Sequence, residues 1–216
     1  MVIVISKKEC YKTVAGRAEA VIIEKKSKFI ATVIPADNEE TALEFLEEMR
    51  KTYSDATHNV YAYVIDENNI FRYSDDNEPS GTAGMPVLDT IRKSGIVDCA
   101  VVVTRYFGGT LLGTGGLVHA YSLAAKEGLL AAGIVERKLS DIISVRVDYT
   151  TGGKLSHYFA QNGVHIDNTV YDTEITYDVC ILYSETEKFM ETMTELTNGR
   201  AIMKVTGRRY VDEKGE

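Results

Sequence analysis

The strongest constraint on the fold lies after Arg137. From there the spacing of apolar residues changes, and a strand–helix–strand pattern occurs twice. Alternating apolar residues predict strands, and apolar residues spaced three and four apart predict helices between them. In chain order we expect strand 139–149, helix 153–162, strand 164–171, strand 174–183, helix 185–198 and strand 200–210. The order βαβ–βαβ over about 70 residues is that of a ferredoxin-like domain.

The first 137 residues predict a different α+β domain. Residues 99–104 are continuously apolar, which is typical of a central strand covered on both faces. In chain order we expect a hairpin or a pair of strands (14–19 and 20–35), helix 39–53, strands 60–65 and 70–73, helix 82–94, strand 99–104 and helix 117–132. The sequence therefore predicts two domains, 1–137 and 138–216, in an α+β protein.

Composition favours a soluble cytoplasmic protein without a membrane segment. No stretch reaches the roughly 18–20 apolar residues of a membrane helix, and the apolar start, residues 1–5, is too short for a signal peptide. Three widely spaced cysteines suit reduced thiols rather than a disulfide framework.

The charge argues against non-specific binding of nucleic acid without excluding a local basic patch. The formal net charge is −8. There are 15 basic and 19 acidic residues up to Arg137, and 9 and 13 after it, so each part carries −4. Nucleic-acid binding usually draws on a basic excess, although net charge says nothing about how the charges are distributed.

The segment 74–84 (SDDNEPSGTAG) is the most unusual in the chain, because acids, glycines and hydroxyls crowd a strand-to-helix connection. One functional interpretation makes the N–H groups at the following helix start an anion site. A second makes Asp75, Asp76 and Glu78 ligands of a hard cation. The structural alternative is a rigid turn whose acids bind those same N–H groups.

A second candidate segment is 105–116 (RYFGGTLLGTGG), a glycine-rich loop expected between the central strand and the helix 117–132. Its backbone N–H groups could hold a phosphate, although the spacing matches neither a Walker A loop nor a dinucleotide turn. Arg105 adds a charge, and Tyr106 and Phe107 are expected to be exposed stacking surfaces for an anion, a base or a peptide. The alternative is that the aromatic rings belong to the core.

The histidines designate no catalytic centre. His58, His119, His157 and His165 show no metal-ligand spacing and neighbour no serine or cysteine in a recognisable triad. We therefore expect no catalytic residue, no metal and no cofactor, and the chain is more easily understood as a binding protein than as an enzyme.

Several long motifs resemble the YigZ/IMPACT family. They are Ser27-Lys-Phe-Ile-Ala31, Ala56-Thr-His58 before Val60-Tyr-Ala-Tyr63, and the segments 74–84 and 105–116. The bacterial two-domain YigZ type resembles this chain throughout. The resemblance implies a first domain with the β–α fold of domain IV of elongation factor G, some ribosomal proteins and GHMP kinases. The second domain of this chain is similar to the last domain of elongation factor G.

The resemblance also implies a role and a set of site residues. Eukaryotic IMPACT relatives regulate translation, so the implied partner here is the ribosome, RNA or a translation factor. The chain departs from the family pattern at Asn59, Asn77 and His119. The family motif falls on His58, Asp75, Asp76, Glu78, Pro79, Ser80, Gly81, Thr82, Gly84, Arg105, Tyr106, Phe107, Gly108, Gly109, Gly113, Gly115 and Gly116.

Three functions follow as alternatives. The first is a translation-associated protein that binds the ribosome, RNA or a translation factor. The second is an enzyme acting on a phosphorylated or nucleotide ligand, with Arg105 and the glycine loop on the phosphate and His58 as acid or base. The third is a protein-docking module that binds no nucleic acid. All three require the segments 74–84 and 105–116 to meet on one face.

Overall fold

The computed structural model describes residues 8–213, and the predicted absence of a signal peptide concerns residues outside that range. The described residues form two compact units, one of residues 11–136 and one of residues 8–10 with 137–213. Both are mixed α and β, which confirms the predicted α+β class. The division into domains 1–137 and 138–216 stays a prediction.

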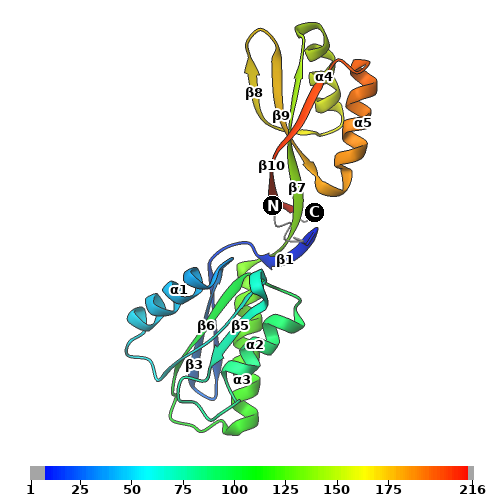
Figure 1. Ribbon diagram of the computed structural model, residues 1–216. Coiled ribbons are helices and arrows are strands. Elements are labelled where there is room, and N and C mark those ends of the chain that lie inside the picture. Colours follow the sequence, from blue (N-terminus) through cyan, green and yellow to red (C-terminus); the bar gives the residue numbers. More distant parts are fainter. Residues whose placement is uncertain (1–7, 214–216) are drawn as a thin grey trace. The chain divides into compact units, whose positions relative to one another are not determined.

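The first unit is built on an antiparallel sheet with the strand order β2-β3-β6-β4-β5. The apolar strand β6 lies at its centre, as the sequence predicted. Figure 1 shows α1 on one face of the sheet and α2 with α3 on the other. The elements are β2 (Ala18–Glu24), β3 (Ser27–Pro35), α1 (Glu39–Thr52), β4 (His58–Ile65), β5 (Ile70–Ser74), α2 (Gly84–Lys93), β6 (Cys99–Tyr106) and α3 (Gly113–Ala132).

Two apolar clusters hold this unit together, one on each face of the sheet. Under α1 the core is formed by Phe45, Leu46 and Met49, which lie on one side of that helix. Under α2 and α3 the cluster includes Phe29 and Tyr121, whose rings meet edge to face at 5.1 Å. Each face of β6 is therefore buried, which is why its residues alternate neither in polarity nor in exposure.

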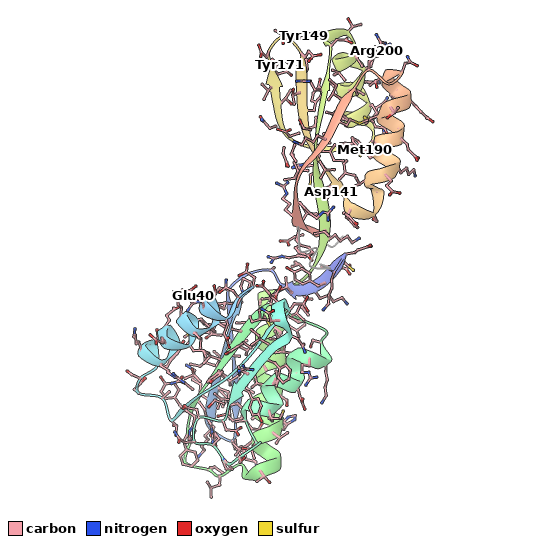
Figure 2. All side chains as sticks on the ribbon, in the orientation of Figure 1. Glu40, Asp141, Tyr149, Tyr171, Met190 and Arg200 are labelled. Atoms are coloured by element: carbon pink, nitrogen blue, oxygen red, sulfur yellow. The ribbon has the colours of Figure 1, made fainter. Side chains whose placement is uncertain are left out.

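The second unit has the predicted ferredoxin-like arrangement. Its strands have the order β10-β7-β9-β8, and β1 (Cys10–Val14) also pairs with β7. Tyr149, at the start of α4, and Tyr171, at the end of β8, lie at the same end of the unit (Figure 2), where the Tyr149 hydroxyl donates to the Asp172 carbonyl. The elements are β7 (Ile134–Val147), α4 (Tyr149–Gln161), β8 (His165–Tyr171), β9 (Ile175–Leu182), α5 (Thr186–Thr197) and β10 (Ile202–Glu213).

Two expectations about the first unit were wrong. The hairpin or strand pair was expected to divide between residues 19 and 20, but the tight turn lies at Lys25 and Lys26, both with positive φ, and joins β2 to β3 in a hairpin. The helix expected from Leu117 begins one turn earlier, at Gly113. Glycine lowers helix propensity, which is why the sequence pattern placed these residues in a loop.

No helix within residues 8–213 combines the length and the hydropathy that crossing a membrane requires.

Candidate functional site

A pocket of about 460 Å³ lies where the segments 74–84 and 105–116 come together in the first unit. The start of β4, the end of β6, the loop 107–112 and the first turn of α3 meet there. The requirement that the two segments share one face is therefore met. The pocket is lined by Thr57, His58, Glu78, Pro79, Arg105, Phe107, Leu111, Leu112, Gly113, Thr114 and Leu117.

The floor of the pocket contains a buried ion pair. Nη1 of Arg105 lies 2.6 Å from Oε1 of Glu78, and the two residues are only 5% and 8% exposed. Arg105 also stacks its guanidinium over the rings of Phe29 and Phe107, at 5.4 and 5.6 Å. The charge of Arg105, considered from the sequence as a partner for an anion, a base or a peptide, is neutralised inside the protein by Glu78, 27 positions earlier in the chain.

Glu78 is the centre of a wider polar network. The Tyr121 hydroxyl donates to the same Oε1 at 2.8 Å. Burial, and then the neighbouring Glu78 carboxylate, raises the pKa of Tyr121, so the phenol stays neutral and keeps its donor proton. Nε2 of His58 lies 3.7 Å from this oxygen.

His58 is held in one orientation by the backbone. Its Nδ1 lies 2.8 Å from the Asp76 carbonyl oxygen. Because a carbonyl can only accept, Nδ1 carries a proton, and in the neutral ring Nε2 is left with its lone pair. The side chain that sequence reasoning considered as an acid or base therefore has a fixed tautomer and lines the pocket.

Asp75 occupies the N-terminus of α2. Its carboxylate accepts from the backbone N–H groups of Gly81, Ala83 and Gly84 at 2.9, 3.1 and 2.8 Å. These are the donors that an external anion would need. Of the three interpretations of this segment, the contacts of Asp75 match the self-capped turn, because its carboxylate occupies the place of an external anion.

The other members of the segment 74–84 also have separate partners. Asp76 accepts from the Asn59 backbone N–H at 2.5 Å, and Thr82 donates from Oγ1 to the Pro79 carbonyl at 2.6 Å. Ser80 is exposed, and Asn77 has φ +67°, a conformation that asparagine tolerates. In residues 8–213 no three side chains of the metal-binding types are grouped so that they could hold an ion.

The glycines of the second segment have two different functions. Gly108 packs directly on the β2–β3 turn, since a Cβ there would lie 2.1 Å from the Lys26 carbonyl carbon. Gly109 and Gly113 have positive φ, so each allows the chain a turn that other residues rarely adopt. Gly115 and Gly116 lie in the first turn of α3, which has no side-chain cap within the described residues.

The aromatic residues after Arg105 differ in exposure. Phe107 is 46% exposed, as expected for a stacking surface. Tyr106 is half-buried, and its hydroxyl donates to Asp55 at 2.8 Å. Leu111, in the same loop, is 85% exposed. Phe107 and Leu111 both line the pocket and give it an apolar rim.

Sequence reasoning missed several contributors. The buried Ser27 hydroxyl accepts from the Gly108 N–H at 3.2 Å and faces Nη2 of Arg105 at 3.4 Å. Tyr121 and Leu117 resembled ordinary core residues of a helix. Of these three residues, only Ser27 could have been identified from the sequence, because it is the first residue of the first family motif.

Comparison with known proteins covers both units. The model of the Impact N-terminal domain matches residues 25–129, and that of a domain of unknown function (DUF1949) matches residues 145–200. The chain is 40% identical to the IMPACT family member YvyE of *Bacillus subtilis* over 94% of each chain. It is 44% identical to the IMPACT family member YigZ of *Escherichia coli*, over 49% of this chain and 53% of that one.

Two further comparisons define the extent of the likeness. The chain is 32% identical to Protein IMPACT of *Rattus norvegicus* over 46% of this chain and 33% of the rat protein. A solved structure titled "Crystal structure of an hypothetical protein" is 28% identical and superposes with a TM-score of 0.59, covering 93% of this chain and 99% of that one.

Proposed function

The chain belongs to the IMPACT family as a bacterial YigZ-type member, and on this premise we propose that it is a translation-associated protein that binds ribosomal RNA. It acts in the cytoplasm, where translation takes place. The family resemblance to regulators of translation and to elongation factor G supports the general theme. The observation that carries the proposal is the pocket, with an apolar rim on one side and a lysine cluster beside it.

The lysine cluster consists of Lys25, Lys26 and Lys28. All three are exposed, and the turn that carries the first two packs against Gly108 of the pocket loop. Lys28 pairs with Tyr106 in the register of β3 and β6. A local basic cluster of this kind acts on a nearby phosphate despite a net charge of −8, because distant charges are screened within about 8 Å at physiological salt.

The first turn of α3 adds phosphate donors to the same region. Gly113 and Thr114 line the pocket at the positive end of a 20-residue helix. At the start of α2 the Gly84 N–H donates to Asp75, whereas within residues 8–213 the Leu112 side chain does not cap α3. Lysine charge, helix N–H groups and an exposed ring together match the backbone and the bases of single-stranded RNA.

The test is co-sedimentation of the full chain with ribosomes over a series of salt concentrations. The wild type is expected to pellet at low salt and to be released as salt rises. The variant Lys25→Gln/Lys26→Gln/Lys28→Gln should bind less and reduce the log–log salt slope by about 2. The charge-matched control, Lys12→Gln/Lys51→Gln/Lys93→Gln, removes three other exposed lysines and should behave as the wild type.

Two outcomes contradict the proposal. If the wild type fails to pellet even at low salt, ribosome binding is excluded. If pelleting persists with salt-insensitive affinity after the lysines are replaced, the partner is a protein, as in the docking-module alternative.

A second candidate, an enzyme acting on a nucleotide or phosphorylated ligand, is favoured by one observation. Nε2 of His58 retains its lone pair in the neutral ring at the pocket, as a general base requires. Incubation with nucleotides followed by chromatography tests it. A conversion that His58→Gln abolishes would favour the enzyme over the binding protein.

A further inference from the structure

The walls of the pocket suit a flat apolar group. Pro79, Phe107, Leu112 and Leu117 contribute carbon surface, and only His58, Glu78 and Arg105 contribute charged or ionisable groups. A volume of about 460 Å³ lies within the usual range of small-molecule sites. Because Phe107 is 46% exposed, part of its ring is free to stack on a ligand.

Two of the side chains that line the pocket, Glu78 and His58, offer hydrogen-bond acceptors. Arg105, Tyr121 and His58 all approach Glu78 at Oε1, so in the described part of the chain Oε2 has no hydrogen-bond donor. Oε2 of Glu78 is also not one of the side-chain atoms that are fully buried without a hydrogen-bond partner in the described residues. With Nδ1 donating to the Asp76 carbonyl, Nε2 of His58 is the second acceptor whenever the ring is neutral, and it lies 3.7 Å from the same carboxylate.

Two neighbouring acceptors select a ligand with two neighbouring donors. Among the four RNA bases only guanine has them, in N1–H and the N2 amino group. Adenine and cytosine place a ring acceptor beside their amino group, and uracil flanks its N3–H with two carbonyls. Each of these would set an acceptor against Glu78 or His58 and leave buried groups unpaired.

From this match we infer that the pocket binds a guanine nucleotide, with the base stacked on Phe107 and its N1–H and N2 amino groups donating to Glu78 and His58. Arg105 does not touch the base in this arrangement. Its contact with Oε1 keeps a charged carboxylate in a buried position and so maintains the acceptor. If the nucleotide is a residue of RNA, the inference rests on the proposed function and specifies which base the site selects.

The experiment is calorimetric titration of the full chain with GMP, AMP, CMP and UMP, which separates base recognition from ribosome binding. GMP is expected to bind at least tenfold more tightly than the other three. Glu78→Gln should abolish the preference. Phe107→Ala should weaken GMP at least about fivefold, the lower end of the usual effect of removing a stacking ring.

Controls keep the test decisive. Phe71→Ala removes an aromatic ring of similar exposure, 42%, that does not line the pocket, and it should leave GMP affinity unchanged. If Glu78→Gln fails to fold, Phe107→Ala still tests the site, because Phe107 lies outside the hydrogen-bond network of Glu78. Equal affinity for all four nucleotides, or no binding of any nucleotide or oligonucleotide, overturns the inference.

A second arm distinguishes a free nucleotide from an RNA residue. A six-nucleotide single strand with one central guanine is compared with the same strand carrying adenine. If the strand with guanine binds more tightly than GMP, the natural ligand is a guanine residue of RNA. If GMP binds selectively and the strand does not bind, the natural ligand is a free nucleotide. Ribosome binding without guanine preference overturns this inference alone, and guanine preference without ribosome binding overturns the proposed function alone.

Discussion

The guanidinium of Arg105 and the carboxylate of Glu78 meet at 2.6 Å although neither residue is more than 8% exposed. Such a pair tolerates the loss of both charges better than the loss of one, since a single remaining ion stays buried without compensation. The pair therefore connects stability of the first unit with the chemistry of its pocket.

Replacing Arg105 with alanine should destabilise the protein by about 3–5 kcal/mol, because Glu78 would remain as an unpaired buried charge. The measurement is urea unfolding followed by circular dichroism. The double variant Arg105→Met/Glu78→Gln removes both charges and should recover part of the loss. An unchanged unfolding midpoint for Arg105→Ala would show that the pair is not buried as described.

Gly108→Ala should destabilise the protein by roughly 1–3 kcal/mol, because the added Cβ would lie 2.1 Å from the Lys26 backbone. Gly115→Ala is the matched control within the same segment. No atom lies within 4 Å of the Cβ position there, and the residue is helical, so alanine should be neutral or stabilise by up to about 1 kcal/mol. Thermal unfolding of both variants measures the two changes in stability. Equal changes for Gly108→Ala and Gly115→Ala would contradict the packing of Gly108 on the turn.

Asp75→Ala should cost about 2 kcal/mol, the upper end for loss of a helix cap, because three N–H groups lose their acceptor. Asp75→Asn keeps one acceptor oxygen and should lose less. Hydrogen exchange at Gly81, Ala83 and Gly84 measures the effect at the site itself. Protection that is unaltered in Asp75→Ala would mean that these amides have another acceptor.

Asp98 predicts a specific pH dependence of stability. Burial raises the pKa of Asp98 above its ordinary value, despite the opposing hydrogen bond from the Asp66 backbone N–H. The folded state therefore holds this proton more tightly than the unfolded state, so ionised Asp98 destabilises the fold at pH values above its folded pKa. As pH falls through that pKa, the penalty disappears.

The variant Asp98→Asn removes this penalty and keeps an acceptor for the Asp66 N–H. It should be more stable than the wild type at neutral pH, and the difference in unfolding free energy should shrink on acidification. Asparagine also tolerates the φ of +54° at this position. Denaturant titrations of both proteins from pH 7 to pH 4 measure the difference. If the difference in unfolding free energy between the two proteins grows as pH falls, the pKa of Asp98 is lowered by folding and not raised.

Periodicity was enough to predict most of the fold, because amphipathic patterns directly reflect burial on a sheet or a helix. The apolar side of α1, the central position of β6 and the βαβ–βαβ order of the second unit all follow from such patterns. The start of α3 could not be predicted from periodicity, because its first turn contains Gly113, Gly115 and Gly116. Tertiary packing overrides the low helix propensity of these glycines.

The candidate site was harder to predict, since its properties depend on contacts between distant positions. The motifs identified the two segments that meet, but not that Glu78 buries the charge of Arg105 or that Asp75 fills the start of α2. Local composition gives the residue types in a loop and not their partners. The apolar wall contributed by Leu117 was hidden for the same reason, because a leucine on a helix indicates a core position first.

The Ser27 hydroxyl joins the end of the lysine turn to the pocket loop through the Gly108 N–H. A molecule that shifts the loop 107–112 on entering the pocket would therefore also disturb this hydrogen bond, which lies directly after the turn at Lys25 and Lys26. If the two proposed ligands both bind, a disturbance of this kind would couple the two binding events energetically, and the coupling would act equally in both directions. The proposed nucleotide would in this way adjust how strongly the protein holds the proposed RNA.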